Sequence, residues 1–288
     1  MSRKLLITII GIIVLLCTAS SQKYSLVKVW ETDTVFQTPE SVVYDALRDR
    51  LYVSNYNRFP RDLASTNDFI SALDLDGNIV KLKWITGLIA PCGISIHADH
   101  LYIAERDGIS KYNIETEKLI EKISLKTGFL NDVAIGKDGI VYFTDTSPRN
   151  REAATVCAIK QGRIDTIADE PINRVNGLLY HEGSLLVGNS GDLTLKRIDL
   201  ESREVFDIVK LDTGIIDGIK NYQGNEYLVS HWSGNLYLVS SGGTITELLN
   251  TRKKKISIAD FEYIKELNLV IIPTFGTNRV IAYRIEVE

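Results

Sequence analysis

A repeated segment constrains the fold of this chain more than any other feature of its sequence. Six stretches share one plan, in which a small or polar residue precedes a short strand, a turn and an apolar strand. They read PESVVYDALRDRLYVSN, PCGISIHADHLYIAE, LNDVAIGKDGIVYFTD, VNGLLYHEGSLLVGN, IDGIKNYQGNEYLVSH and ADFEYIKELNLVIIP. Their second positions are Glu40, Cys92, Asn131, Asn176, Asp217 and Asp260, spaced by 52, 39, 45, 41 and 43 residues. This period is typical of one four-stranded propeller blade.

The sequence therefore predicts an all-β fold, a six-bladed β-propeller of four-stranded blades. The last unit has only three evident strands, while one further strand at residues 26–32 precedes the first unit. Pairing that N-terminal strand into the last blade would close the ring and remove an exposed edge. A β-sandwich with coincidentally similar strands is the alternative, and six units with matched turns argue against it. Because no linker or change of composition divides the chain, we expect one domain over residues 23–288.

Residues 1–22 have the pattern of a signal peptide. Arg3 and Lys4 precede an apolar run that ends at Leu16, and small polar residues follow. A run of about 12 residues is shorter than the roughly 20 that span a bilayer, so we expect no stable membrane span. The protein is predicted to be exported, to the periplasm or outside the cell. Cys17 offers an alternative, a lipid anchor, although Leu16 is not the small residue usual before such a cysteine.

The rest of the composition is ordinary for a globular protein. A formal charge of −4 with 24% charged residues gives no nucleic-acid-binding signature. Cys92 and Cys157 remain after export. A disulfide between them in an oxidising compartment is the alternative, and we expect two buried, unbridged thiols. The sequence carries no signal for an oligomeric state.

The repeat predicts a ring of oxygen-bearing side chains in the central channel. Inner strands line the channel of a propeller, so residues at one repeat position face each other. The members are Glu40, Asn131, Asn176, Asp217 and Asp260, with Cys92 as the exception. One such residue often only caps a turn. Crowded acids, however, need a neutralising cation, and carboxylates with amides suit calcium. We therefore predict one divalent cation, Ca²⁺ first, with Zn²⁺, Mn²⁺ or Mg²⁺ as alternatives.

A second set of polar residues ends the second strand of each unit and is expected around the mouth of the channel. It comprises Asn55, Glu105, Asp145, Asn189, His231 and Pro273. His231 is the candidate proton acceptor, because a neutral imidazole can take a proton from water. The alternative is an ordinary rim histidine packed against Trp232.

Four of these segments resemble the metal-site segments of the gluconolactonase, senescence-marker and luciferin-regenerating-enzyme family, over residues 35–285. They are TPESVVYD, FLNDVAIGKDGIVYFTDT, RVNGLLYHEGSLLVGNS and IIDGIKNYQGNEYLVSHWSGNLY. The resemblance implies a metal-dependent hydrolase of lactones or related esters. It casts Glu40, Asn176 and Asp217 as metal ligands, with Asp217 also handling the proton.

The same resemblance places Asn131 beside the metal, where it helps to hold substrate. In the more distant, similar paraoxonases the matching asparagine is itself a ligand. Sugar-lactonases of the family carry an arginine where this chain has Phe129, so the resemblance implies a less polar substrate here.

Two other functions remain open from the sequence. The first is a non-catalytic propeller that binds a ligand or protein and holds a structural calcium. The second resembles the strictosidine-synthase-like propellers, which use a glutamate without a metal, and Glu105 is the candidate for that role.

Overall fold

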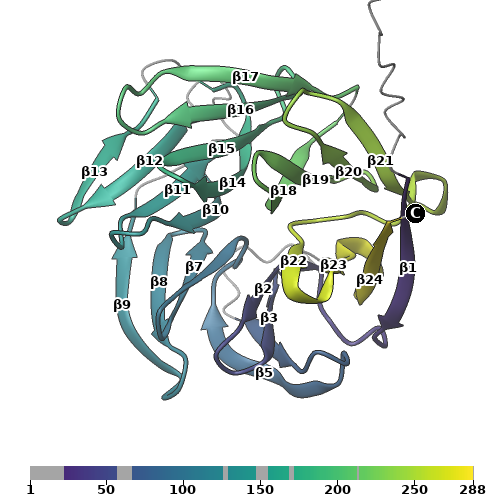
Figure 1. Cartoon of the computed structure of the whole chain (residues 1–288). Coiled ribbons are helices and arrows are strands. Elements are labelled where there is room, and N and C mark those ends of the chain that lie inside the picture. Colours follow the sequence, from purple (N-terminus) through teal and green to yellow (C-terminus); the bar gives the residue numbers. More distant parts are fainter. Residues whose placement is uncertain are drawn as a thin grey trace, which may run out of the picture.

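The computed structural model describes residues 23–56, 67–125, 129–146, 155–168, 172–212 and 214–287. Its strands form six antiparallel sheets of four strands each. Figure 1 shows these sheets arranged as blades around a central axis. The predicted six-bladed propeller is therefore confirmed.

Each blade runs from an inner strand to an outer one. The inner strands are β2 (Pro39–Asp45), β6 (Ile94–His97), β10 (Leu130–Ile135), β14 (Val175–His181), β18 (Ile216–Gln223) and β22 (Glu262–Ile264). The second strands are β3 (Arg50–Asn55), β7 (His100–Glu105), β11 (Val141–Asp145), β15 (Ser184–Asn189), β19 (Glu226–His231) and β23 (Leu269–Pro273). The third strands are β4 (Asp68–Leu73), β8 (Gly108–Asn113), β12 (Thr155–Lys160), β16 (Thr194–Asp199), β20 (Asn235–Val239) and β24 (Val280–Val287).

The outer strands are β5 (Ile79–Leu88), β9 (Lys118–Ser124), β13 (Arg163–Thr166), β17 (Val205–Lys210), β21 (Ile245–Asn250) and β1 (Tyr24–Glu31). Three short 3₁₀ turns complete the described elements, η2 (Arg252–Lys254), η3 (Lys265–Leu267) and η4 (Phe275–Thr277).

The core consists of six apolar clusters, and each cluster fills the space between two neighbouring blades. Second strands such as β3 and β15 have apolar residues on both faces because a blade packs against each side. This arrangement explains why their sequences read as short continuous apolar runs rather than as alternating ones.

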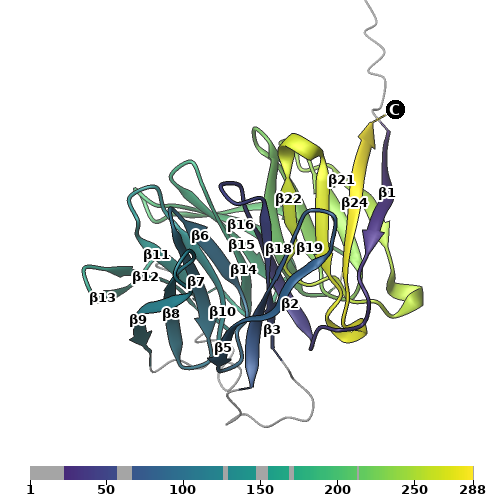
Figure 2. The ribbon, with the colours of Figure 1, turned by 90° about the horizontal axis from the view of Figure 1, so that it is seen from below.

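The N-terminal strand closes the ring. β1 pairs antiparallel with β24, from Tyr24 opposite Val287 to Glu31 opposite Ile281. Figure 2 shows the two strands side by side at one edge of the molecule. Trp30 of β1 also donates from Nε1 to the carbonyl oxygen of Leu75 in the first blade, at 2.8 Å. The predicted closure is therefore confirmed, and it joins the last blade to the first.

The remaining predictions concern the N-terminal segment and the two cysteines. The signal peptide and the Cys17 anchor lie outside the described residues, so export remains a prediction. Among the described residues, no helix is long and apolar enough to cross a membrane. Cys92 and Cys157 are both buried and are not joined by a disulfide, as expected.

Candidate functional site

A β-bulge at the start of the inner strand positions the predicted ring residue in four of the six blades. The flanking pairs are Pro39–Asn55 and Val42–Val53, Leu130–Asp145 and Val133–Phe143, Val175–Asn189 and Leu178–Val187, and Ile216–His231 and Ile219–Val229. The bulges contain Glu40, Asn131, Asn176 and Asp217. A bulge takes residues out of the strand ladder and redirects their side chains. Because the register is the same in four blades, the four predicted ligands share one level of the channel.

Glycine follows the ring residue in three blades because the neighbouring blade comes too close for a side chain. A Cβ atom on Gly177 would lie 1.5 Å from the carbonyl oxygen of Asp217. One on Gly218 would lie 2.7 Å from Oδ1 of Asp260, and one on Gly93 would lie 2.2 Å from Oδ1 of Asp132. None of these glycines has a positive φ, so the constraint is steric. The Asn-Gly and Asp-Gly motifs therefore mark close contacts between blades.

Hydroxyl groups in the second strands connect neighbouring inner strands at this level. Thr144 Oγ1 accepts from the backbone N–H of Asp132 at 3.0 Å and donates to the carbonyl oxygen of Asn176 at 2.7 Å. Ser230 Oγ likewise donates to the carbonyl oxygen of Ala259 in the next blade, at 3.0 Å. These bonds fix the backbone that carries the ring residues.

Glu40 and Asp217 carry strongly perturbed carboxyl groups. Burial, followed by the negative charges of Asp217, Asp260 and Asp132, raises the pKa of Glu40 well above its ordinary value. Burial together with Asp260 and Asp132 does the same to the pKa of Asp217. Raised carboxyl pKa values mean that the surroundings do not neutralise the charge. The ring therefore favours protons or a cation.

Two of the predicted ligands have oxygen atoms that no protein group satisfies. Glu40 Oε2 and Asn176 Oδ1 are buried and lack a hydrogen-bond partner. Leaving such an atom unpaired costs about 1–3 kcal/mol, so each one requires an explanation. Carboxylate and amide oxygens are the ligands that calcium and other hard cations prefer. The residues present therefore fit a divalent cation.

The composition of this set differs from the commonest metal sites. Within the described part of the chain, no three His, Cys, Asp or Glu side chains form a cluster that could hold a metal ion. The candidate ring instead combines two carboxylates with the amides of Asn131 and Asn176. Amide ligands suit calcium better than zinc.

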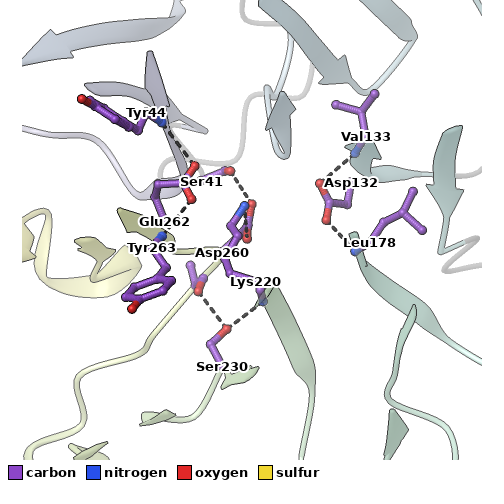
Figure 3. A network of polar contacts seen from close by, with 12 residues as sticks. Ser41, Tyr44, Asp132, Val133, Leu178, Lys220, Ser230, Asp260, Glu262 and Tyr263 are labelled. Atoms are coloured by element: carbon purple, nitrogen blue, oxygen red, sulfur yellow. Dashed lines mark hydrogen bonds and ion pairs between the residues drawn. The ribbon is translucent and has the colours of Figure 1, made fainter. Parts of the chain in front are cut away.

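A second charged layer lies beside the ring. It contains Asp260, which the sequence placed in the ring, together with residues that the sequence did not single out. Figure 3 shows Lys220, Asp260 and Glu262 on one side of the channel and Asp132 on the other. Lys220 Nζ lies 3.7 Å from Oδ1 of Asp260, whose Oδ2 accepts from the Ser41 hydroxyl at 2.6 Å. These groups come from inner strands or the residues just before them.

Lys220 supplies a positive charge to this layer. Burial alone would lower the pKa of Lys220, but Asp260, Glu262 and Asp132 together raise it above its ordinary value. Burial, with Asp260 adding to it, raises the pKa of Asp132 to about 8. Three acids thus surround one ammonium group, and the channel remains short of positive charge even with Lys220 in place.

The inner strands open at their other end into a cavity of about 480 Å³. Lys220, Asp132 and Glu262 line this cavity together with aliphatic residues of the inner strands. Two signals in the sequence pointed to the layer. Asp132 directly follows Asn131, and Lys220 lies three residues after Asp217 on the same inner strand.

The second set of polar residues has a structural role in three blades. Asn55, Glu105 and Asp145 are buried and accept backbone N–H groups from the segments that lead into their own inner strands. Glu105 is further engaged by the Ser110 hydroxyl and by Lys122 at 3.4 Å. These side chains therefore hold the entry segments in place rather than surround an open mouth. Glu105 in particular is poorly suited to acid–base chemistry.

His231 is fully buried at the end of β19. Its Nδ1 lies 2.8 Å from the Ser233 hydroxyl, and its Nε2 lies 3.5 Å from the Arg252 guanidinium. A Cβ atom on Gly214 would lie 1.8 Å from the ring, so the segment entering β18 covers the imidazole. The catalytic role of His231 stays a prediction, and both ring nitrogens already face protein groups.

Aromatic side chains lie just outside the ring. Phe129, two residues before Asn131, contacts Tyr56 edge to face, with ring centroids 6.4 Å apart. Trp232 and Phe275 form a second such pair at 5.8 Å. Phe129, the predicted substrate residue, is half-buried.

Comparison with solved structures identifies the same fold in several enzymes. A gluconolactonase from Xanthomonas campestris matches with a TM-score of 0.70 and 15% identity, over 91% of this chain and 89% of that one. A streptogramin B lyase matches with a TM-score of 0.66 and 12% identity, over 91% and 98%. A luciferin-regenerating enzyme matches with a TM-score of 0.65 and 10% identity, over 92% and 95%.

This chain has the gluconolactonase fold. The fold expected from the sequence resemblance is therefore confirmed. No model of a known protein family matches the sequence, and no curated protein matches it either. At these identities the likeness shows the fold alone, and the lyase shares it as well. The chemistry must be argued from the channel residues.

Proposed function

We propose that this protein is a divalent-metal-dependent hydrolase of a lactone or related ester, with calcium as the preferred ion. The gluconolactonase-like fold supports a hydrolase of this type. The observation that carries the metal dependence is the pair of buried, unpartnered oxygens on Glu40 and Asn176. They share one level of the channel with Asp217. Burial of the Asp217 carboxyl group disfavours its ionised form.

Each ring residue has a distinct part in this proposal. Glu40, Asn176 and Asp217 would hold the ion, and Asn131 would add an oxygen or bind substrate beside it. When bound, the ion would polarise the carbonyl of the substrate and stabilise negative charge on its oxygen.

Asp217 is the group that would take the proton of the attacking water. Its carboxylate is buried in the bulge at the start of β18, at the level of the proposed ion, where the attacking water would lie. His231 was the other predicted proton acceptor. The contacts of its ring with Ser233 and Arg252 favour Asp217 over His231 for this step.

The experiment that tests this function combines metal analysis with turnover. Purified protein is expected to contain about one divalent ion per chain and to hydrolyse members of a panel of lactones and aryl esters. Removing the ion with a chelator should abolish turnover, because the carbonyl would lose its polarising group. Adding calcium back should restore it.

The main alternative is a non-catalytic binding propeller with a structural calcium. It predicts the same metal content, but no member of the panel would be hydrolysed with or without the ion. Protein that contains no metal, and whose activity a chelator leaves unchanged, would contradict the proposed function directly.

Thermal unfolding at two pH values gives a second test of the metal site. Acids whose pKa is raised on folding favour the folded state at low pH and lose that contribution as pH rises through the folded-state pKa. Asp132, with a pKa of about 8, belongs to this class, as do Glu40 and Asp217, whose pKa values burial raises well above their ordinary range. The chelated protein should therefore be more stable at pH 5 than at pH 8.

Calcium should reverse this order. Ligands must be deprotonated to bind a metal, so the ion should stabilise the protein mainly at pH 8. At a hundredfold excess over its dissociation constant, the gain is about 2.7 kcal/mol. The measurement is the melting temperature with calcium and with chelator at each pH. An equal calcium effect at pH 5 and pH 8 would exclude the ring acids as ligands.

A further inference from the structure

The cavity of about 480 Å³ lies at the end of the channel opposite the oxygen ring, and the proposed reaction does not use it. The ring residues stand at the start of the inner strands, and residues that line the cavity follow them on the same strands. Lys220 lies three residues beyond Asp217, and Tyr180 lies four residues beyond Asn176. At about 3.3 Å per residue, these steps amount to roughly 10 to 13 Å along a strand. The cavity is therefore distinct from the ring.

The lining of the cavity combines a few charged groups with a mainly aliphatic wall. Lys220, Asp132 and Glu262 line it, and so does Asp45, whose carboxylate already pairs with Arg48 at 3.0 Å. The aliphatic wall includes Ile94, Ile96, Val133, Leu178 and Leu179. Sites for small molecules commonly have about 300–1,000 Å³, apolar walls and a small number of polar groups. The size and the lining of this cavity fit a small ligand.

Backbone N–H groups, rather than cations, hold the carboxylates of Asp132 and Glu262. Asp132 accepts from the N–H groups of Val133 and Leu178, each at 2.7 Å. Glu262 likewise accepts two backbone N–H groups, at 2.8 and 3.2 Å. Such neutral donors fix the direction of a carboxylate but bring no full positive charge to it. Both carboxylates therefore have a fixed position and can still bind a cation.

The nearby ammonium group lies closest to an acid outside the cavity lining. Lys220 Nζ is 3.7 Å from Oδ1 of Asp260. Figure 3 shows Glu262 on the same side of the channel as Lys220, and Asp132 on the opposite side. In the part of the chain that the structure describes, neither Asp132 nor Glu262 forms an ion pair within 4.0 Å. The cavity thus carries an excess of negative charge, which favours a cationic ligand.

An organic cation suits this lining better than a second metal ion does. Among the described residues, no three His, Cys, Asp or Glu side chains are grouped so that they could hold a metal ion. None of the described residues that line the cavity carries an amide side chain, and the aliphatic wall offers no oxygen ligands. The ammonium group of Lys220 also repels a divalent ion more strongly than a monovalent one. The same wall can cover an alkyl chain, whose removal from water is favourable.

We propose that this cavity is a second binding site of the protein, for a small primary alkylammonium ion. The charged end of the ligand lies between the carboxylates of Asp132 and Glu262, and its alkyl chain lies against the aliphatic wall. The site goes beyond the proposed hydrolase function, because it uses none of the ring residues and does not require an ion in the ring.

The test titrates butylammonium into the full-length protein by calorimetry at pH 8, once with saturating calcium and once with chelator. An alkylamine, like the lysine side chain, is still charged at this pH. We expect saturable binding of about one butylammonium per chain under both conditions. The neutral 1-butanol and the anionic butyrate, which have chains of similar length, should bind at least about tenfold more weakly because they cannot form a charge-assisted bond to the carboxylates.

Two variants test the position of the ligand. Glu262→Gln should weaken butylammonium binding roughly 10- to 100-fold, the usual effect of losing a hydrogen bond to a charged group. Ser95→Leu should abolish binding without changing any charge, because Ser95 is a half-buried residue of the cavity lining and leucine would fill the space. Glu105→Gln is the matched control. Glu105 is also buried and accepts a backbone N–H, but it lies outside the cavity lining, so its variant should bind butylammonium as the native protein does.

The contradicting results are specific. An absence of saturable butylammonium binding, or an equal affinity for 1-butanol, would overturn the inference. So would native affinity in both Glu262→Gln and Ser95→Leu when these variants melt as the native protein does. Displacement of butylammonium by a second calcium ion per chain would show a metal site instead. Because each result is a binding measurement, it stands or fails independently of whether the protein hydrolyses lactones or esters.

Discussion

Asp217→Asn is expected to lower turnover of the preferred lactone or ester about a thousandfold, even when calcium saturates the protein. Loss of a general base typically costs about 10² to 10⁴ in rate. An amide of the same size keeps an oxygen that can face the ion, but it cannot accept the proton of water. The measurement is kcat at saturating substrate and calcium, with bound metal determined on the same sample.

Asp260→Asn is the matched comparison. Asp260 occupies the same repeat position in the last blade and is equally buried. Its carboxylate, however, already accepts from Ser41 and lies beside Lys220. We expect this variant to keep turnover within about tenfold of the native value, because its carboxylate contacts neither water nor substrate in the proposed reaction.

The metal content of the Asp217→Asn variant separates the two roles proposed for Asp217, which are holding the ion and accepting the proton. If Asp217→Asn loses both turnover and calcium, its main part is to hold the ion. Retained calcium with lost turnover supports proton transfer. Full activity in Asp217→Asn would remove this residue from the site.

The six repeats were sufficient to predict the fold and the level of the channel at which the ring residues meet. Register carries this information, because equivalent positions in a propeller converge whatever their distance along the chain. The same logic identified Glu40 and Asn176, whose unpartnered oxygens are the main support for the proposed ion.

The second charged layer could not be predicted in the same way. Lys220 and Glu262 stand at unrelated repeat positions, so no periodicity links them to Asp132. Their meeting depends on how the inner strands are placed around the channel, which is a tertiary property. Similarly, Asn55 and Glu105 looked like rim residues in the sequence. Their burial against backbone N–H groups became visible only once the entry segments were placed.

Lys220→Met is expected to destabilise the protein by about 3–5 kcal/mol at pH 8, the usual cost of removing one partner from a buried charge cluster. Methionine keeps most of the length and apolar volume of the side chain. The variant therefore removes the ammonium group and leaves Asp132, Asp260 and Glu262 without their positive neighbour. Urea unfolding at fixed calcium concentration measures the change.

Lys28→Met is the surface control. Lys28 pairs with Glu31 at 2.9 Å, and its side chain is 54% exposed. Exposed ion pairs contribute about 0–1 kcal/mol, so this variant should unfold nearly as the native protein does. A similar loss of stability in both variants would show that Lys220 contributes no more than an exposed lysine does.

The pH dependence of the Lys220→Met effect is the sharper test of its origin. Burial raises the pKa of Asp132 to about 8 and also raises the pKa of Asp260 and Glu262, so Asp132 takes up a proton as the pH falls from 8 toward 5. A protonated acid carries no negative charge for the ammonium group of Lys220 to neutralise. The destabilisation should therefore shrink steadily over that range, in the opposite direction to acid denaturation. A constant or growing deficit at pH 5 would mean that Lys220 acts through packing, and the cluster would then not control the charge of the channel.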